Sequence, residues 1–147
     1  MEIVLKTFKE LNTTELYNLL QLRAEVFVVE QDCVYQDLDG KDKKSWHVMG
    51  FESDDLIAYT RIFAPGDYFE EASIGRVVVS PNYRGNSYGK VIMNASIKAV
   101  EDLFGSGRQV TISAQCYLLR FYNELGFVQV GKTYLEDGIP HIKMTLK

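Results

Sequence analysis

Apolar residues fall into two periodic patterns along the chain, and each pattern predicts a different element. Ile74 to Val79 is an apolar run rich in β-branched residues that stops at Ser80 and Pro81, which predicts a buried strand. Beyond it, apolar positions recur every three or four residues, which predicts a long helix with one buried stripe. The stripe consists of Tyr88, Val91, Ile92, Ala95, Ala99 and Leu103, and Gly105 and Gly107 end the helix. Ser87, just before the helix, is its candidate N-cap.

The other elements follow from the same two patterns. Weak alternation over residues 2–8 predicts an opening strand, and Asn12 with Glu15 forms a capping box that begins a helix ending near Val29. The remaining predictions are antiparallel strands at 46–52 and 56–64, a polar turn at 40–44, a strand at 109–114, a short helix at 117–125, and an antiparallel pair at 127–135 and 141–146 around Asp137-Gly138. This order predicts a mixed sheet with helices on its faces, an α/β (α+β) fold, in one domain spanning residues 1–147.

The segment between the predicted strand and helix, residues 84–90, has the composition of an anion-binding turn. The first turn of a helix leaves backbone N–H groups unpaired, and the helix dipole adds positive charge there, so an anion is stabilised. Gly85 and Gly89 let the main chain approach a ligand closely, and Arg84 and Lys90 carry charges that suit a pyrophosphate. The segment is either a phosphate cradle or a surface turn that caps a helix and carries two solvated charges.

The charge balance narrows the range of partners. A net charge of -4 and a pI near 5.2 argue against a nucleic-acid-binding protein, because phosphate contacts need a concentrated basic surface. Asp32, Asp37, Asp39 and Asp42 cluster in one loop-like stretch. This stretch is interpreted either as a surface that attracts an amine or as a solvated acidic loop.

The sequence also bears on location and metal chemistry. No apolar run approaches the length of a membrane span and the N-terminus lacks the pattern of a signal peptide, so we expect a cytoplasmic protein without a membrane partner. Cys33 and Cys116 are expected to be reduced thiols. His47 and His141 are the two histidines, and together with two distant cysteines they form no metal-binding motif.

Residues 84–89 resemble the acetyl-CoA signature of the GNAT (Gcn5-related) N-acetyltransferases, Gln/Arg-x-x-Gly-x-Gly/Ala, except that Ser87 replaces the middle glycine. Four further segments resemble the ElaA-like subgroup of this family, in the expected order over nearly the whole chain. They are residues 22–31, 35–40, 121–127 and 136–142. The resemblance implies the GNAT fold, a mostly antiparallel sheet splayed in the middle, with the pantetheine arm between the strand before the phosphate turn and the strand at 109–114.

The resemblance also implies an activity, the transfer of an acetyl group from the cosubstrate acetyl-CoA to a primary amine by direct attack on the thioester. It implies no metal, and the acceptor would be an amine-bearing small molecule or protein. The cofactor-binding residues it implies are Val77, Val78, Val79, Arg84, Gly85, Asn86, Ser87, Tyr88, Gly89, Lys90 and Gln115. The three valines would act through main-chain groups. A catalytically idle module that binds acetyl-CoA or a partner is the alternative, and a homodimer is left open.

By the same resemblance Tyr122 is the general acid that protonates the departing thiolate. Spacing allows a second interpretation, because Leu118, Phe121, Tyr122 and Leu125 also form a helical core stripe. Cys116 offers a further alternative, an acetyl-cysteine intermediate, against the usual role of a small buried hydrophobe.

The general base is not identified by the sequence, since neither central strand contains a carboxylate. The candidates for it are Glu30, Asp37, Asp39, Glu71 and His141. The candidate substrate contacts are Arg23, Phe27, Glu30, Gln31 and His141, which lie in the two segments expected around the acceptor. His141 has a suitable ordinary pKa, although a single histidine on a terminal strand is more often structural.

Overall fold

The computed structural model describes residues 1–147 and contains a seven-stranded sheet in the order β1-β2-β3-β4-β5-β7-β6. The strands are β1 (Glu2–Thr7), β2 (Trp46–Glu52), β3 (Asp55–Phe63), β4 (Ala72–Val79), β5 (Val110–Gln115), β6 (Val128–Glu136) and β7 (Ile139–Leu146). All neighbouring strands pair antiparallel except β4 and β5, which are parallel. The predicted mixed, mostly antiparallel sheet is therefore confirmed.

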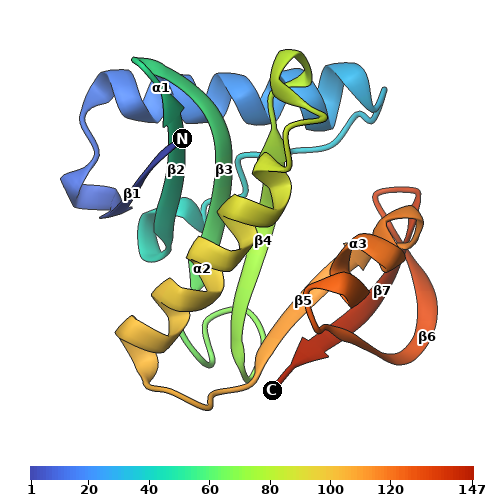
Figure 1. Ribbon diagram of the computed structural model, residues 1–147. Helices are drawn as coiled ribbons and strands as arrows, with labels where there is room; N and C mark the ends of the chain where they lie inside the picture. The colour runs from blue at the N-terminus through green and yellow to red at the C-terminus, as the bar shows by residue number, and fades with distance from the viewer.

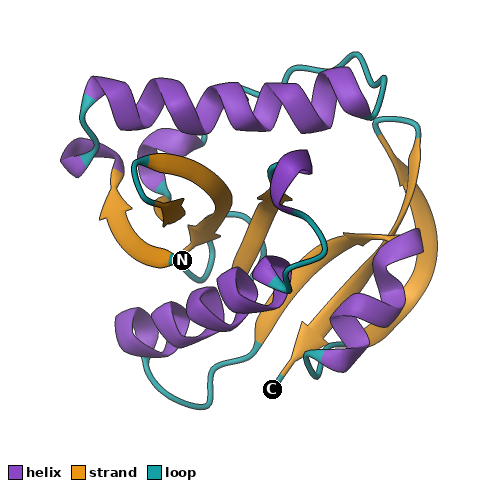
Figure 2. Cartoon of the chain, turned by 45° about the horizontal axis from the view of Figure 1, so that its top comes forward, coloured by secondary structure: helices purple, strands orange, loops and turns teal.

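Three α-helices accompany the sheet, α1 (Thr13–Arg23), α2 (Tyr88–Phe104) and α3 (Leu119–Glu124). The helices α1 and α2 cover opposite faces, as the alternation along β3 demonstrates: Tyr59 packs in the core cluster of α1, whereas Ala58 and Ile62 pack in the cluster of α2. Figures 1 and 2 show the sheet between the two helices, with α3 beside β5 and β7.

The first helix begins as predicted and ends differently. The Asn12 side chain accepts a hydrogen bond from the Glu15 N–H at 2.7 Å, and the Glu15 carboxylate accepts one from the Asn12 N–H at 3.0 Å, which completes the capping box. Residues Ala24–Glu30 continue the helix with a wider turn, in which the N–H of Gln31 donates to the carbonyl of Val26 five residues earlier. Such wide turns are rare and are frequent near functional sites.

The buried face of α2 differs from the predicted stripe. Ile92 and Ala99 are buried as predicted, but Val91 and Leu103 are 42% and 36% exposed. Met93, Ser96 and Val100 are buried in their place. A hydrogen bond of 2.6 Å between the hydroxyls of Ser96 and Thr60 of β3 lies in this interface. The apolar pattern missed this face because a hydrogen-bonded serine is buried on it.

The strands β4 and β5 meet at one end only. They pair through Ala72 with Val110 and through Ser73 with Thr111, and then diverge toward the start of α2 (Figure 1). The strand β4 also contains a bulge, since Arg76 has a φ of +50° and the register with β3 shifts at this point. The divergence leaves an opening in the middle of the sheet, which confirms the predicted splay.

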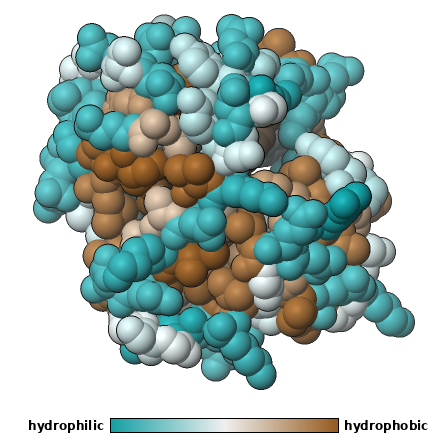
Figure 3. Space-filling view, viewed as in Figure 1, coloured by the Kyte–Doolittle hydropathy of each residue, from teal (hydrophilic) through white to brown (hydrophobic).

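The surface mixes polar and apolar groups. In Figure 3, which has the orientation of Figure 1, apolar side chains form several separate patches among polar ones. No helix is both long and apolar enough to cross a lipid bilayer.

Candidate active site

A pocket of about 750 Å³ occupies the opening between β4 and β5. One end, called the cradle end, is formed by residues 77–90, from the end of β4 to the first turn of α2. The other end, called the aromatic end, is formed by Tyr35, Phe63, Tyr68, Phe69 and Glu136. Segments far apart in the sequence thus meet in one pocket of a size that suits a cofactor-sized ligand.

The cradle end has the local geometry of an anion site. Gly85 has a φ of +84° and Ser87 a φ of +61°, so the chain turns sharply before α2 and its first N–H groups are unpaired. Ser87 stands at the N-cap position, but its hydroxyl makes no capping hydrogen bond, so the predicted side-chain cap is wrong. The predicted cofactor residues that line the pocket are Val77, Val78, Val79, Arg84, Gly85, Ser87, Tyr88, Gly89, Lys90 and Gln115.

Asn86 and Gly89 differ from the other motif residues in what their positions do. Asn86 does not line the pocket, and its side-chain amide donates to the carbonyl of Tyr83 at 3.1 Å. A Cβ atom at Gly89 would lie 3.3 Å from the ring of Phe121. Gly89 is therefore needed for close packing of α2 against Phe121 of α3, in addition to its place beside the pocket.

Both cations of the cradle end are paired with carboxylates. The Arg84 guanidinium donates to both oxygens of Glu30, at 2.7 and 2.9 Å, and Lys90 Nζ lies 3.0 Å from Glu124. The hydrogen bonds from Arg84 lower the pKa of Glu30. These pairs are exposed and hence weak, so a phosphate group could compete with the carboxylates for the two cations.

Tyr122 is placed both as a core residue and as a residue that could act as a general acid. The side chain is 5% exposed, its ring lies at edge-on angles to Phe121 and Phe127, and it also lines the pocket. Its hydroxyl makes no hydrogen bond to another protein group, and burial raises the pKa of Tyr122 above its ordinary value. The phenol therefore keeps its proton near neutral pH and can donate it to a ligand atom in the pocket.

Gln115 and Gln31 meet across the pocket. The Gln115 side-chain amide donates to the Gln31 side-chain oxygen at 3.2 Å, and Phe27 lines the pocket beside them. Cys116 does not line the pocket, whereas Cys33 does, with its thiol donating to the carbonyl of Asp137 at 3.3 Å. The two cysteines form no disulfide. The alternative of an acetyl-cysteine at Cys116 thus lacks the contact with the pocket that it requires.

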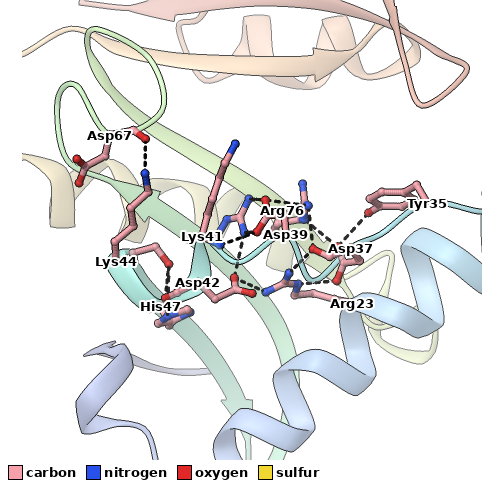
Figure 4. Close-up of polar contacts among 12 residues, drawn as sticks. Arg23, Tyr35, Asp37, Asp39, Lys41, Asp42, Lys44, His47, Asp67 and Arg76 are labelled. Carbon is pink, nitrogen blue, oxygen red and sulfur yellow. Dashed lines mark hydrogen bonds and ion pairs between the residues drawn. The ribbon is translucent and has the colours of Figure 1, made fainter.

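Three of the four aspartates in the acidic stretch belong to a buried ion-pair network. The stretch is therefore neither a surface that attracts an amine nor a solvated acidic loop. Figure 4 shows Asp37, Asp39 and Asp42 facing arginines from other elements. Arg23 of α1 pairs with Asp37 at 2.9 Å and with Asp42 at 2.7 Å. Arg61 of β3 pairs with Asp39 and Asp42, and Arg76 at the bulge of β4 pairs with Asp37 and Asp39. These three carboxylates are therefore unavailable to attract an amine; Asp32 is exposed and lies outside the network.

Arg23 was predicted to contact the substrate, and this prediction is wrong. Its side chain is fully buried, does not line the pocket, and is held by Asp37 and Asp42. Burial would raise the pKa of Asp39, but the hydrogen bonds from Arg61 outweigh burial and lower it to about 2. The network fixes the loop after α1 against β3 and β4, and this loop carries Tyr35 into the pocket wall.

His141 is the one candidate base that lines the pocket without an arginine partner. Its Nδ1 donates to the carbonyl of Ile139 at 2.7 Å, so the neutral ring presents Nε2 as an acceptor. Nε2 lies 3.4 Å from a carboxylate oxygen of Glu136, and the other oxygen of Glu136 accepts from Ser113 at 3.1 Å. By contrast, Glu30, Asp37 and Asp39 are paired with arginines, and Glu71 is hydrogen-bonded by Thr111 outside the pocket.

Sequence reasoning missed most of the aromatic end. Phe63, Tyr68 and Phe69 lie at the end of β3 and in the loop before β4, a segment that carries no motif. A run of aromatic residues in a predicted loop was the available signal, because large apolar side chains outside strands and helices often line binding sites.

Comparisons with known proteins agree with this geometry. Residues 10–147 match the family model described as the acetyltransferase (GNAT) domain. The chain is 44% identical to protein ElaA of Escherichia coli K12 over 137 residues, 92% of this chain and 89% of that protein. The crystal structure of Escherichia coli ElaA matches with a TM-score of 0.92 at 40% identity, and that of an acyl-CoA N-acyltransferase from Pseudomonas aeruginosa with a TM-score of 0.92 at 42% identity, each covering 100% of both chains. The chain belongs to the GNAT acetyltransferase family.

Proposed function

We propose that this protein transfers the acetyl group of acetyl-CoA to a primary amine by direct attack of the amine on the thioester. The observation that carries the proposal is the single pocket between β4 and β5, which has an anion-binding turn at one end and both Tyr122 and His141 in its wall. The 42% identical relative from Pseudomonas aeruginosa is named an acyl-CoA N-acyltransferase, which supports the same reaction class.

The residues of the cradle end fit the pyrophosphate of acetyl-CoA. The turn at Gly85 and Ser87 directs unpaired N–H groups of α2 toward the pocket, and Arg84 and Lys90 stand beside it. The main chain of Val77 to Val79 borders the gap where β4 no longer pairs with β5, so groups on that side can bind the pantetheine arm. The Val79 carbonyl also accepts a hydrogen bond from Arg84 Nε at 3.3 Å. When bound, acetyl-CoA supplies a thioester carbonyl that an amine can attack.

His141 is proposed as the general base. An amine attacks only as the neutral form, so a proton must leave the ammonium first. Nε2 of the neutral imidazole can accept this proton, since Nδ1 is engaged by Ile139, and the adjacent Glu136 carboxylate stabilises the resulting imidazolium.

Tyr122 is proposed as the general acid. Burial keeps its hydroxyl protonated, and no protein group competes for the proton. Burial raises the pKa of this phenol above its ordinary value near 10. Exclusion of water raises the pKa of the leaving thiol in the same way, so donation from the phenol to the thiolate is feasible in the pocket.

The test combines calorimetry with acetyl-CoA and a thiol-release assay over a panel of primary amines. We expect binding of acetyl-CoA and release of thiol with at least one amine. Binding without turnover on any amine would support the idle module instead, and absence of binding would contradict both functions.

A further inference from the structure

The two ends of the pocket differ in charge. At the cradle end the side chains include the cations Arg84 and Lys90. At the aromatic end Arg61 and Arg76 also line the pocket, but Asp37, Asp39 and Asp42 neutralise them together with Arg23, three carboxylates for three guanidinium groups. Glu136 and its neighbour Asp137 remain as carboxylates without an arginine or lysine partner, and 39% of the Glu136 side chain is exposed.

Part of the wall at this end is a row of aromatic rings. The ring centroids of Phe63 and Tyr68 lie 5.1 Å apart, and those of Tyr68 and Phe69 lie 5.0 Å apart. The rings are tilted to one another, by 37° and 60°, and Phe63 is buried behind the other two. Tyr68, which is 40% exposed, and Phe69 therefore provide the apolar surface at this end. Three lysines lie against this wall, Lys44 by Phe63, Lys41 by Tyr68 and Lys143 by Phe69, but none of them lines the pocket. The surface offered to a ligand at this end therefore consists of the rings, the carboxylates of Glu136 and Asp137, and the neutralised guanidinium groups of Arg61 and Arg76.

Tyr68 and Glu136 face the same space. Both residues line the same pocket. Burial raises the pKa of Tyr68, and the charge of Glu136 acts in the same direction. His141 lies beside Glu136, so a cation held by the carboxylate would also be near the proposed base.

We propose that the acceptor is a primary monoamine with an aromatic or similarly flat apolar body. Glu136 holds its ammonium group, and the rings of Tyr68 and Phe69 hold its body, with Phe63 packed behind them. A polyamine would lack the ring that the aromatic end contacts, and an amino acid would bring its own carboxylate close to that of Glu136. This inference rests on the proposed acetyl transfer and adds the class of acceptor.

The first experiment measures kcat/KM for thiol release with phenethylamine, phenylalanine, ethylamine and spermidine at saturating acetyl-CoA. Phenethylamine is expected to exceed each of the others by at least about tenfold, because the loss of a ring contact or the approach of a like charge each costs that much. A preference for phenylalanine would show that Arg76 or Arg61 selects a carboxylate, and a preference for ethylamine or spermidine would show that the rings do not hold the acceptor. Each of these rankings overturns this inference alone, whereas no turnover with any amine overturns the proposed function as well.

The second experiment compares Glu136→Gln with the wild type. The amide keeps the size of the side chain but loses its charge, so kcat/KM for phenethylamine is expected to fall about 10- to 100-fold, with a clear rise in KM. Acetyl-CoA affinity, measured by calorimetry, should not change, and Glu101→Gln, at an exposed position on α2, is the matched control. A fall in kcat with unchanged KM would mean that Glu136 only positions His141, and the ammonium site would then be wrong.

Discussion

The cradle end of the pocket is built from one continuous segment, residues 77–90, whereas the aromatic end collects side chains from the loop after α1, the end of β3, the loop before β4 and the end of β6. The cradle end binds through main-chain geometry that a short motif can encode. The aromatic end depends on a buried ion-pair network that holds distant segments together. A local motif can thus point to the proposed cofactor site, whereas the proposed acceptor site is assembled only by folding.

The largest effect is expected at Tyr122, which lies between the two ends. Tyr122→Phe keeps the ring and its packing, so stability and acetyl-CoA affinity should change little, while the maximal rate falls by about 10² to 10⁴ as the positioned acid is lost. The measurement is kcat for thiol release, with Tyr17→Phe, at an exposed position on α1, as the control. If the variant keeps the wild-type kcat, Tyr122 has only a structural role.

The network that supports the aromatic end is expected to be the most sensitive to loss of a charge. Asp42→Asn removes the carboxylate shared by Arg23 and Arg61 and leaves both guanidinium groups buried with less compensation. The free energy of unfolding should fall by about 3 to 5 kcal/mol, measured by urea denaturation at pH 7. Asp54→Asn, in the exposed turn after β2, should have almost no effect.

The stability that Asp42 contributes depends on pH. Burial would raise the pKa of Asp42, but Arg23 and Arg61 together lower it below its ordinary value. Its charge therefore stabilises the folded state fully above pH about 4, and this stabilisation is lost as the pH falls below that value. The difference in stability between wild type and Asp42→Asn should accordingly vary by no more than a few tenths of a kcal/mol, roughly, from pH 5 to 7 and shrink in more acidic solution. A difference that grows on acidification would contradict the ion-pair assignment.

At the cradle end the ion pair between Glu30 and Arg84 is exposed, so a much smaller effect is expected. Glu30→Gln releases Arg84 for the pyrophosphate, and acetyl-CoA affinity should increase about two- to fivefold while the melting temperature changes little. Calorimetry measures the affinity, and Glu101→Gln again serves as control. Weaker binding would mean that Glu30 holds Arg84 in the orientation that the cofactor needs.

The smallest effect concerns Ser87, which departs from the family motif. Its φ of +61° strains any residue with a Cβ, and its hydroxyl makes no cap. Ser87→Gly should therefore raise the free energy of unfolding by up to about 1 kcal/mol and leave acetyl-CoA affinity unchanged or higher. Ser80→Gly, where φ is -54°, should instead lower stability. A large loss of affinity in Ser87→Gly would show that the hydroxyl itself binds phosphate.

Several features of the fold followed directly from the sequence because they depend on neighbouring residues. The capping box of Asn12 and Glu15, the strand that stops at Pro81, and the two-residue turn at Asp137 and Gly138 were all predicted, and the structure contains them. Each is set by interactions within a few residues, such as a side chain that caps its own helix or a turn that needs positive φ. The turn of the cradle end is likewise set by residues close together in the sequence.

The burial of polar residues could not be predicted in this way. Ser96 is buried in α2 because Thr60 of β3 lies opposite, and Arg23 is buried because Asp37 and Asp42 reach it from a later loop. A helical pattern contains no information about a partner 14 or 36 residues away. Both positions were therefore misread, Ser96 as outside the buried stripe and Arg23 as a substrate contact.

By itself the sequence determined the family, the order of elements and the anion-binding turn, because these depend on local periodicity and on a contiguous motif. Only the tertiary structure decided which carboxylates are free. Asp37, Asp39 and Asp42 are neutralised by arginines from three elements, while Glu136 faces the pocket beside His141. The chemistry of a charged side chain is set by what lies within a few ångströms of it, and for these residues the neighbours are brought together only by folding.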